Sequence, residues 1–127
     1  MVLSEVFIGQ NVNQNEGQEM TPDQIYHRDM NWIYDADVIV ADVSRISLGV
    51  GFEIGWMLGR NGRVLTLCKQ EMYEKLSNMV KGCRHPGFSL HVWKDTADLE
   101  QILTTELGNA KDNDQNAIVF NKSNFVS

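Results

Sequence analysis

The sequence predicts an α/β fold in which helices cover a mainly parallel sheet. Short runs of apolar, β-branched residues alternate with longer segments that begin or end in helix-capping residues. The clearest run, residues 38–43, is apolar at almost every position, which is typical of a parallel strand buried on both faces. The length of 127 residues corresponds to a single domain.

Strands and helices are predicted to follow one another in the order that this fold class requires. The expected strands are residues 2–8, 38–43, 64–69, 89–93 and 117–120. The expected helices are residues 22–34, 50–60, 72–81 and 97–107, and the polar residues 10–20 form a loop. We assign residues 1–108 to one α/β domain and residues 109–127 to a polar tail that carries the last, short strand.

Capping residues define the boundaries of these helices. Thr21 can accept a hydrogen bond at the start of the first helix, Pro22 suits the first helical position, and Gln24 completes a capping box. Asp95 or Thr96 can cap the last helix. A glycine follows the C-terminal end of each of the last three predicted helices, at positions 62, 82 and 108, where it favours termination of the helix.

The composition excludes several classes of function. Lys and Arg total 11 while Asp and Glu total 17, so the net charge is −6. Such an acidic chain is poorly suited to a nucleic acid polymer, which is held by clustered basic residues, although a helix N-terminus can still bind one small phosphate. No apolar run approaches the ~20 residues of a membrane span, and we expect no secretory leader.

Cysteine and histidine spacing gives no metal or redox motif. Cys68 and Cys83 fit neither a redox pair nor a zinc site, and the histidines form no His-x-x-x-His pair. We therefore expect two free thiols in a reducing compartment, the cytoplasm with the nucleus as a second location. We expect no metal and no cofactor.

The segment after residues 38–43 is the first place to look for a ligand site, because open α/β sheets bind ligands beyond the carboxyl ends of their strands. Ser47 precedes Gly49 and Gly51, which allow the backbone to approach a ligand where a helix begins. A tight turn whose glycines serve packing is the alternative. A dinucleotide fingerprint fits poorly, because these glycines and Gly55 have a different spacing.

Two carboxylates lie on the apolar faces of predicted helices. Glu53 falls on the stripe of its helix three residues after Val50, and Asp29 falls on the stripe of an earlier helix four residues after Ile25. A carboxylate that faces inward is uncommon unless it is paired or functional. The alternatives are that Glu53 only caps its helix and that Asp29 pairs with a Lys or Arg.

Two converging carboxylates predict a site for glycosidic bond cleavage. In such sites one carboxylate is the nucleophile and the other is the acid. The expected position of Glu53 in the first turn of its helix, near the positive end of the helix dipole, favours the ionised form that a nucleophile requires.

The string Ser47-Leu48-Gly49-Val50-Gly51-Phe52-Glu53, together with the strand before it and with Asp29 and Trp32 upstream, resembles the 2′-deoxynucleoside 5′-phosphate N-hydrolases. These enzymes belong to the nucleoside 2-deoxyribosyltransferase-like group. The resemblance covers roughly residues 1–107 and implies a flavodoxin-like or Rossmann-like sandwich. It also implies release of the base from a 2′-deoxynucleoside 5′-monophosphate.

The same resemblance implies a role for each site residue. Glu53 would attack C1′ of the sugar and form a glycosyl ester, and Asp29 would position the substrate or assist the leaving base. Ser47, with Gly49 and Gly51, would bind the 5′-phosphate. Ser77 would reach the phosphate site of a neighbouring subunit in a homodimer. A binding or dimerisation module without catalysis, and a transferase that moves deoxyribose between bases, are the alternatives.

The chain departs from the family in its first unit, because it begins at what resembles the family's second strand. The family's first strand, Gly-Ser-x-Arg-Gly loop and first helix have no counterpart there. Three arrangements are open. The chain is a truncated or alternatively spliced form, or residues 2–8 pair beside residues 38–43, or residues 117–120 occupy the vacant position with Asn121-Lys122-Ser123 as a substitute loop.

Overall fold

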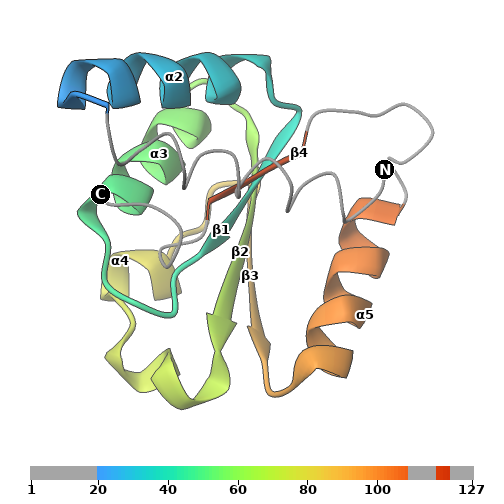
Figure 1. Cartoon of the computed structure of the whole chain (residues 1–127). Helices are drawn as coiled ribbons and strands as arrows, with labels where there is room; N and C mark the ends of the chain where they lie inside the picture. The colour runs from blue at the N-terminus through green and yellow to red at the C-terminus, as the bar shows by residue number, and fades with distance from the viewer. Residues whose placement is uncertain (1–19, 109–116, 121–127) are drawn as a thin grey trace.

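The computed structural model describes residues 20–108 and the backbone of residues 117–120, which form an α/β sandwich around one sheet (Figure 1). The strands are β1 (Val38–Asp42), β2 (Arg63–Lys69), β3 (Phe88–Trp93) and β4 (Ala117–Phe120). The helices are α2 (Pro22–Asp35), α3 (Leu48–Gly59), α4 (Asn78–Lys81) and α5 (Thr96–Leu107), with a 3-10 helix, η1 (Gln70–Lys75), before α4. The predicted fold class is confirmed.

The sheet has the strand order β3-β2-β1-β4, and all its strands are parallel. Val38 at the start of β1 is in register with Arg63 of β2 on one edge and with Ala117 of β4 on the other. Both edges of β1 are therefore occupied, so a direct pairing of residues 2–8 with β1 is wrong. The vacant position is taken by β4. Residues 2–8, residues 10–19 and the proposed loop 121–123 lie outside the described residues.

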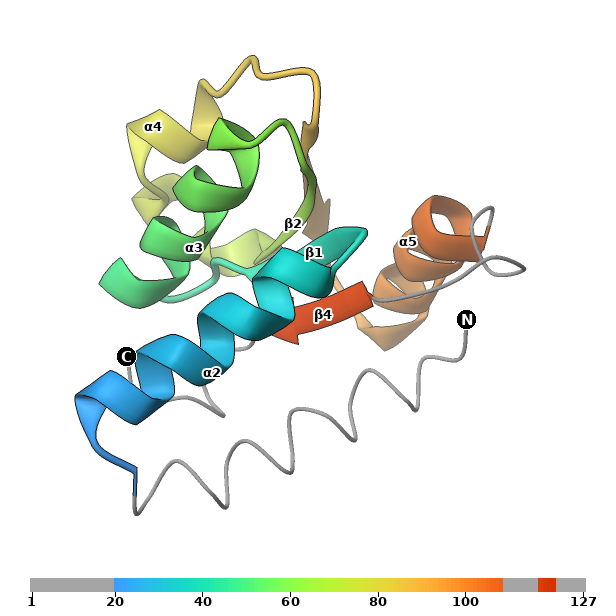
Figure 2. The ribbon, with the colours of Figure 1, turned by 90° about the horizontal axis from the view of Figure 1, so that it is seen from above.

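Helices cover both faces of this sheet, and one face carries more helices than the other. Helices α2, α3 and α4 lie on one face and α5 lies on the other (Figure 2). Alternate residues of β1 serve the two faces, since Ile39 packs towards α2 and α3 whereas Val40 packs towards α5. Among the helices described, none combines the length and the hydropathy needed to cross a membrane.

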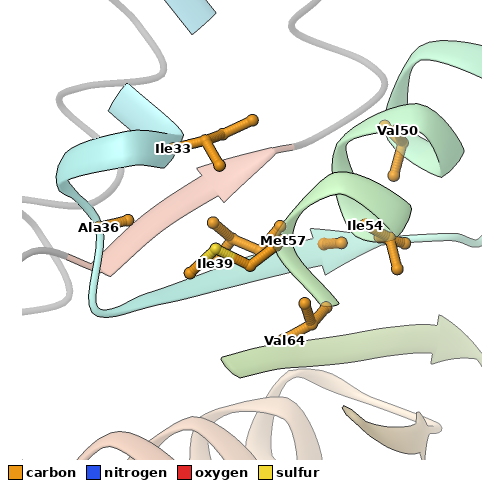
Figure 3. Packing of buried hydrophobic residues seen from close by; sticks show 8 residues of the cluster. Ile33, Ala36, Ile39, Val50, Ile54, Met57 and Val64 are labelled. Carbon is orange, nitrogen blue, oxygen red and sulfur yellow. The ribbon is translucent and has the colours of Figure 1, made fainter. Parts of the chain in front are cut away.

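The larger core cluster lies beneath α2 and α3. Ile33 of α2, Ile39 of β1, and Met57 of α3 are fully buried there, and their side chains meet in the space between the two helices and the sheet (Figure 3). Complete burial of each such side chain contributes about 1.5–3 kcal/mol. This packing fixes the faces that α2 and α3 turn towards each other.

The capping residues act largely as predicted. The Thr21 hydroxyl accepts from the Gln24 N–H at 3.1 Å, and the Gln24 side chain accepts from the Thr21 N–H at 2.9 Å. Asp95, rather than Thr96, caps α5 and accepts from the Asp98 N–H at 2.8 Å. The capping box therefore fixes the start of α2, seven residues before Asp29.

Two predicted helix boundaries are wrong. Helix α3 begins at Leu48 instead of residue 50, because the Ser47 hydroxyl caps it by accepting from the Val50 N–H at 3.2 Å. The predicted helix 72–81 is divided into η1 and α4. The division arises at two neighbouring residues. Leu76 has an extended backbone, which ends η1, and the Ser77 hydroxyl caps α4.

We predict that β4 stabilises the sheet through its backbone. A chain that ends at Asn116 loses β4 and leaves one edge of β1 unpaired, and its free energy of unfolding should fall by roughly 2–4 kcal/mol, since each ladder hydrogen bond contributes ~0.5–1.5 kcal/mol. Urea unfolding measures this loss. A chain that ends at Phe120 is the control and should keep most of the stability; equal stability of the two shortened chains would contradict the pairing.

Candidate active site

Helices α2 and α3 bring Asp29 and Glu53 together in the interior. Each residue is only 8% exposed, as their apolar helix stripes predict. Ile33, four residues after Asp29, and Met57, four residues after Glu53, are fully buried in the core below. The two carboxyl groups are therefore held by the packing of the helices that carry them.

A hydrogen bond joins the two carboxyl groups, and burial is the main reason that Glu53 keeps its proton. Burial, the charge of Asp29 and this hydrogen bond raise the pKa of Glu53 to about 9, while the charge of Arg28 acts in the opposite direction. Glu53 therefore carries a proton at neutral pH. The prediction that the helix dipole keeps it ionised is wrong, because α3 starts at Leu48 and places Glu53 beyond the first turn.

Arg28 is a part of this site that the sequence did not single out. Its Nε and NH2 atoms each lie 3.1 Å from Oδ1 of Asp29, and both side chains are 11% exposed. Its guanidinium also lies over the ring of Trp32, 4.9 Å from the centroid. The alternative in which Asp29 pairs with an Arg is thus correct, together with the contact to Glu53. The available signal was the aromatic residue four positions after Arg28, on the same helix face.

The loop between β1 and α3 is fixed at the carboxyl edge of the sheet. Oδ1 of Asp42 accepts from the Ser44 N–H at 2.9 Å, and the Ser44 hydroxyl accepts from the Lys69 N–H at 2.8 Å. These contacts fix the path of the loop that leads to Ser47 at the start of α3. Ser47 is therefore held at a helix N-terminus, as predicted.

Gly49 and Gly51 belong to α3 and not to the loop before it. No glycine among the described residues has a positive φ, so a turn does not require these two. A Cβ atom added to Gly51 would meet nothing within 4 Å, and the same holds for Gly55 and Gly59. The three glycines at intervals of four residues therefore leave one face of α3 bare.

An apolar hollow of about 840 Å³ lies on this bare side of α3. Its wall includes Gly51 and Gly55 of α3, residues of η1 and α4, and the loop that carries Arg45. Four large apolar side chains near it are exposed, namely Ile46, Leu48, Phe52 and Met79. The sequence patterns did not predict this hollow, because it is formed by segments that are distant along the chain.

The predicted site residues fall into two groups on opposite sides of α3. Ser47, Gly51 and Ser77 line the hollow, whereas Asp29 and Glu53 are not part of its wall. Ser77 is exposed, and its hydroxyl accepts from the Met79 N–H at 3.1 Å. The structure therefore separates the carboxyl pair from the serines that line the hollow.

The carboxyl pair has the chemistry of a nucleophile and an acid. One of its two groups can hold a proton while the other is ionised, which is the state that a displacement at an acetal-like carbon requires. The thiol of Cys68 is a poor competitor, because burial and then the charge of Asp42 raise its pKa, against the opposing charge of Lys81. Within residues 20–108, His, Cys, Asp and Glu form no cluster of three that could hold a metal.

Comparison with known proteins shows the family to which this chain is related. The family model described as nucleoside 2-deoxyribosyltransferase matches residues 3–118. A protein of Thermofilum pendens named "Putative 2′-deoxynucleoside 5′-phosphate N-hydrolase 1" is 38% identical over 93 residues, which are 73% of this chain and 65% of the relative. A protein of the same name from Nematostella vectensis is 38% identical over 86 residues, 65% of this chain and 58% of the relative.

A human relative is also similar. The protein of Homo sapiens named 5-hydroxymethyl-dUMP N-hydrolase is 36% identical over 80 residues, which are 62% of this chain and 45% of the relative. The chain thus spans between about half and two thirds of the length of the curated relatives that it matches.

We predict that Glu53→Gln stabilises the protein in a pH-dependent manner. The folded state must keep Glu53 protonated with a pKa of about 9, against 4.5 for the free side chain, so the wild type loses stability as pH rises from 4.5 towards 9. Glutamine has no such proton to retain. The gain should be small at pH 5 and about 3 kcal/mol at pH 7, since one pKa unit corresponds to about 1.4 kcal/mol.

Urea unfolding at pH 5, 7 and 8.5 measures this gain. Glu100→Gln, at an exposed position of α5, is the matched control and should change stability little at any pH. An equal gain for Glu53→Gln at every pH would show that the carboxyl group is not held protonated.

Proposed function

The chain belongs to the nucleoside 2-deoxyribosyltransferase family, and we propose that it hydrolyses the N-glycosidic bond of 2′-deoxynucleoside 5′-monophosphates. The products are the free base and 2-deoxyribose 5-phosphate. The observation that carries the proposal is the buried, hydrogen-bonded pair of Asp29 and Glu53. The names of the relatives, which are N-hydrolases of deoxynucleotides, support this choice of reaction.

Glu53 acts as the nucleophile in this proposal. Its proton passes to Asp29, and the Glu53 carboxylate forms a bond to C1′ as the bond from C1′ to the base nitrogen breaks. The electron pair of that bond leaves with the base, which takes the proton from Asp29. Water then attacks C1′ of the glycosyl ester and gives a proton to Asp29, while Glu53 leaves as a carboxylate. The pair ends with the one proton that it held at the start.

The N-terminus of α3 is proposed to bind the 5′-phosphate. Ser47 caps this helix, and the N–H groups at its start, which include that of Gly49, form the positive end of the dipole. The N–H of Gly51 donates to the Ser47 carbonyl at 3.1 Å, so Gly51 would serve the site through close approach of its bare backbone. Arg45 is exposed in the loop just before the helix and adds a positive charge. Phosphate binding at this end would place the sugar near Glu53, which lies further along the same helix.

A transferase reaction is a second candidate, because the matching family model is described as a deoxyribosyltransferase. The two reactions share the glycosyl ester on Glu53 and differ only in whether water or a second base attacks C1′. Adding an excess of a free base to the assay distinguishes them. Formation of a new nucleotide would favour transfer, whereas release of sugar phosphate alone favours hydrolysis.

We predict that both carboxyl groups are required for base release. Glu53→Ala removes the nucleophile and should lower kcat at least ~1000-fold. Asp29→Asn removes the proton carrier and should lower kcat by ~100- to 10,000-fold. In the wild type, kcat/KM should fall as pH rises above about 9, because the pair then loses the proton that the leaving base requires.

Chromatography of the free base released from each deoxynucleoside monophosphate measures these effects. Glu74→Gln, at an exposed position of η1, is the control and should keep full activity. Turnover that persists in Glu53→Ala would remove the assigned nucleophile. Binding of a deoxynucleotide without release of base by the wild type would instead favour a binding module.

The protein is further proposed to act as a homodimer whose subunits meet at the bare face of α3. Helix α3 has four glycines in 12 residues, and three of them form the bare face. Each is unfavourable by about 1 kcal/mol relative to alanine, unless close approach of another surface requires it. The adjoining hollow is apolar and is lined by exposed apolar side chains, which a second subunit would cover. Ser77 lies in this surface, where it could reach the phosphate of the neighbouring subunit.

We predict that Gly55→Glu converts a dimer into a monomer without unfolding it. A side chain at this position has open space in the single chain, but its charge would be buried against a second subunit. Light scattering during size-exclusion chromatography measures the mass. Thr104→Glu, at an exposed position of α5 on the other face of the sheet, should remain dimeric. A wild type that is monomeric at high concentration would end the proposal.

A further inference from the structure

Arg28 is held in one position by three neighbours. Its Nε and NH2 atoms contact Asp29, its NH1 atom lies 3.2 Å from the sulfur of Met20, and its guanidinium lies over Trp32. The side chain is 11% exposed, although arginine is normally a surface residue. Because Arg28 is enclosed in this way, it also fixes the position of the Asp29 carboxylate with which it pairs.

Both donors of Arg28 use the same oxygen of Asp29, which is Oδ1. Since Glu53 also forms a hydrogen bond with Asp29, the carboxylate of Asp29 lies between a fixed cation and the group that carries the proton. The rotamer of Asp29 therefore depends on Arg28.

We propose that Arg28 is a positioning residue, which aligns Asp29 with Glu53 and supplies the positive charge that balances this carboxyl pair. The proposal rests on the function assigned above to the pair. Arg28 has no contact with the reacting atoms in this scheme and acts through Asp29. Its charge limits how tightly the pair holds its proton and so sets the upper pH at which the pair can work.

The surroundings of the pair contain few competing charges. Among the described residues, Asp29 and Arg28 are the charged groups that act on Glu53. The strands below contribute the apolar side chains of Ile39 and Val64 to this core. On α2, Asp23 and His27 lie 3.5 Å from each other with strongly exposed side chains, so they belong to the outer surface. Arg28 is thus the cation that opposes the effects of burial and of Asp29 on Glu53.

Carboxyl titration by NMR tests the proposal directly. The carbon signal of Glu53, assigned by its loss in Glu53→Gln, is followed with pH in the wild type, in Arg28→Gln and in Arg28→Lys. In Arg28→Gln the pKa of Glu53 should rise by about one unit or more, because an opposite charge within a few ångströms has been removed. Arg28→Lys keeps the charge and should recover most of this shift.

Arg60→Gln is the matched control for the loss of an arginine at α2 and α3. Arg60 also lies over aromatic rings, 5.4 Å from the centroid of Tyr34 and 5.3 Å from that of Trp56, but it donates to backbone carbonyls of Tyr34 and Ala36. It should affect stability without moving the titration of Glu53. An unchanged Glu53 titration in both Arg28 variants would overturn the proposal.

Turnover gives a readout that a purely structural role would not change. The alkaline limit of kcat/KM should move to higher pH in Arg28→Gln together with the NMR titration, and kcat should fall because Asp29 is no longer aligned. Arg28→Lys should restore the pH limit better than it restores kcat, because one ammonium cannot provide the two-donor contact. If the wild type releases no base, the proposed function fails, while the titration still decides the role of Arg28.

Discussion

The burial of two carboxyl groups between α2 and α3 is the constraint on which the rest of this site depends. A pair of carboxyl groups removed from water cannot both remain ionised at low cost, so Glu53 retains its proton. The core below, in which Ile33 and Met57 are fully buried, holds the helices together against this cost. Arg28 offsets a part of it by pairing with Asp29. The packing of the helices therefore contributes at least as much as the neighbouring charges to keeping a proton on Glu53.

The two strands that pair with β1 come from very different places along the chain. Strand β1 carries apolar residues on both faces and needs a partner on each edge, since buried backbone groups must be paired. Strand β2 provides one partner, and β4 provides the other from the far end of the sequence. The parallel direction of β4 brings its carboxyl end to the same edge as the loop before α3. An interior strand is thus completed by a segment that composition alone placed in a polar tail.

Periodicity predicted most of the described elements and the inward orientation of the two carboxylates. Asp29 and Glu53 interrupt apolar stripes, and such an interruption can be detected in a single helix. The partner of each carboxylate depends on how two helices rotate against each other, which no local pattern encodes, so Arg28 was not identified and the protonation of Glu53 was predicted wrongly. The break at Leu76 is made by the extended backbone there and by the Ser77 hydroxyl that caps α4, and a serine inside an otherwise helical segment does not by itself predict such a break. The position of β4 was open because any apolar run can complete a sheet edge.

Helix α3 serves two different surfaces, and its composition reflects both. The face towards α2 carries Glu53 in a tightly packed interior, where a polar group is costly and its environment is strictly defined. The opposite face lacks side chains at Gly51 and Gly55 and borders the apolar hollow. Ser47 lies at the end where the two faces meet, because it caps the helix and also lines the hollow. A substrate phosphate bound at this end would contact the helix between its two faces. The position of α3 would then determine both how a second subunit covers the hollow and how the sugar is oriented at Glu53.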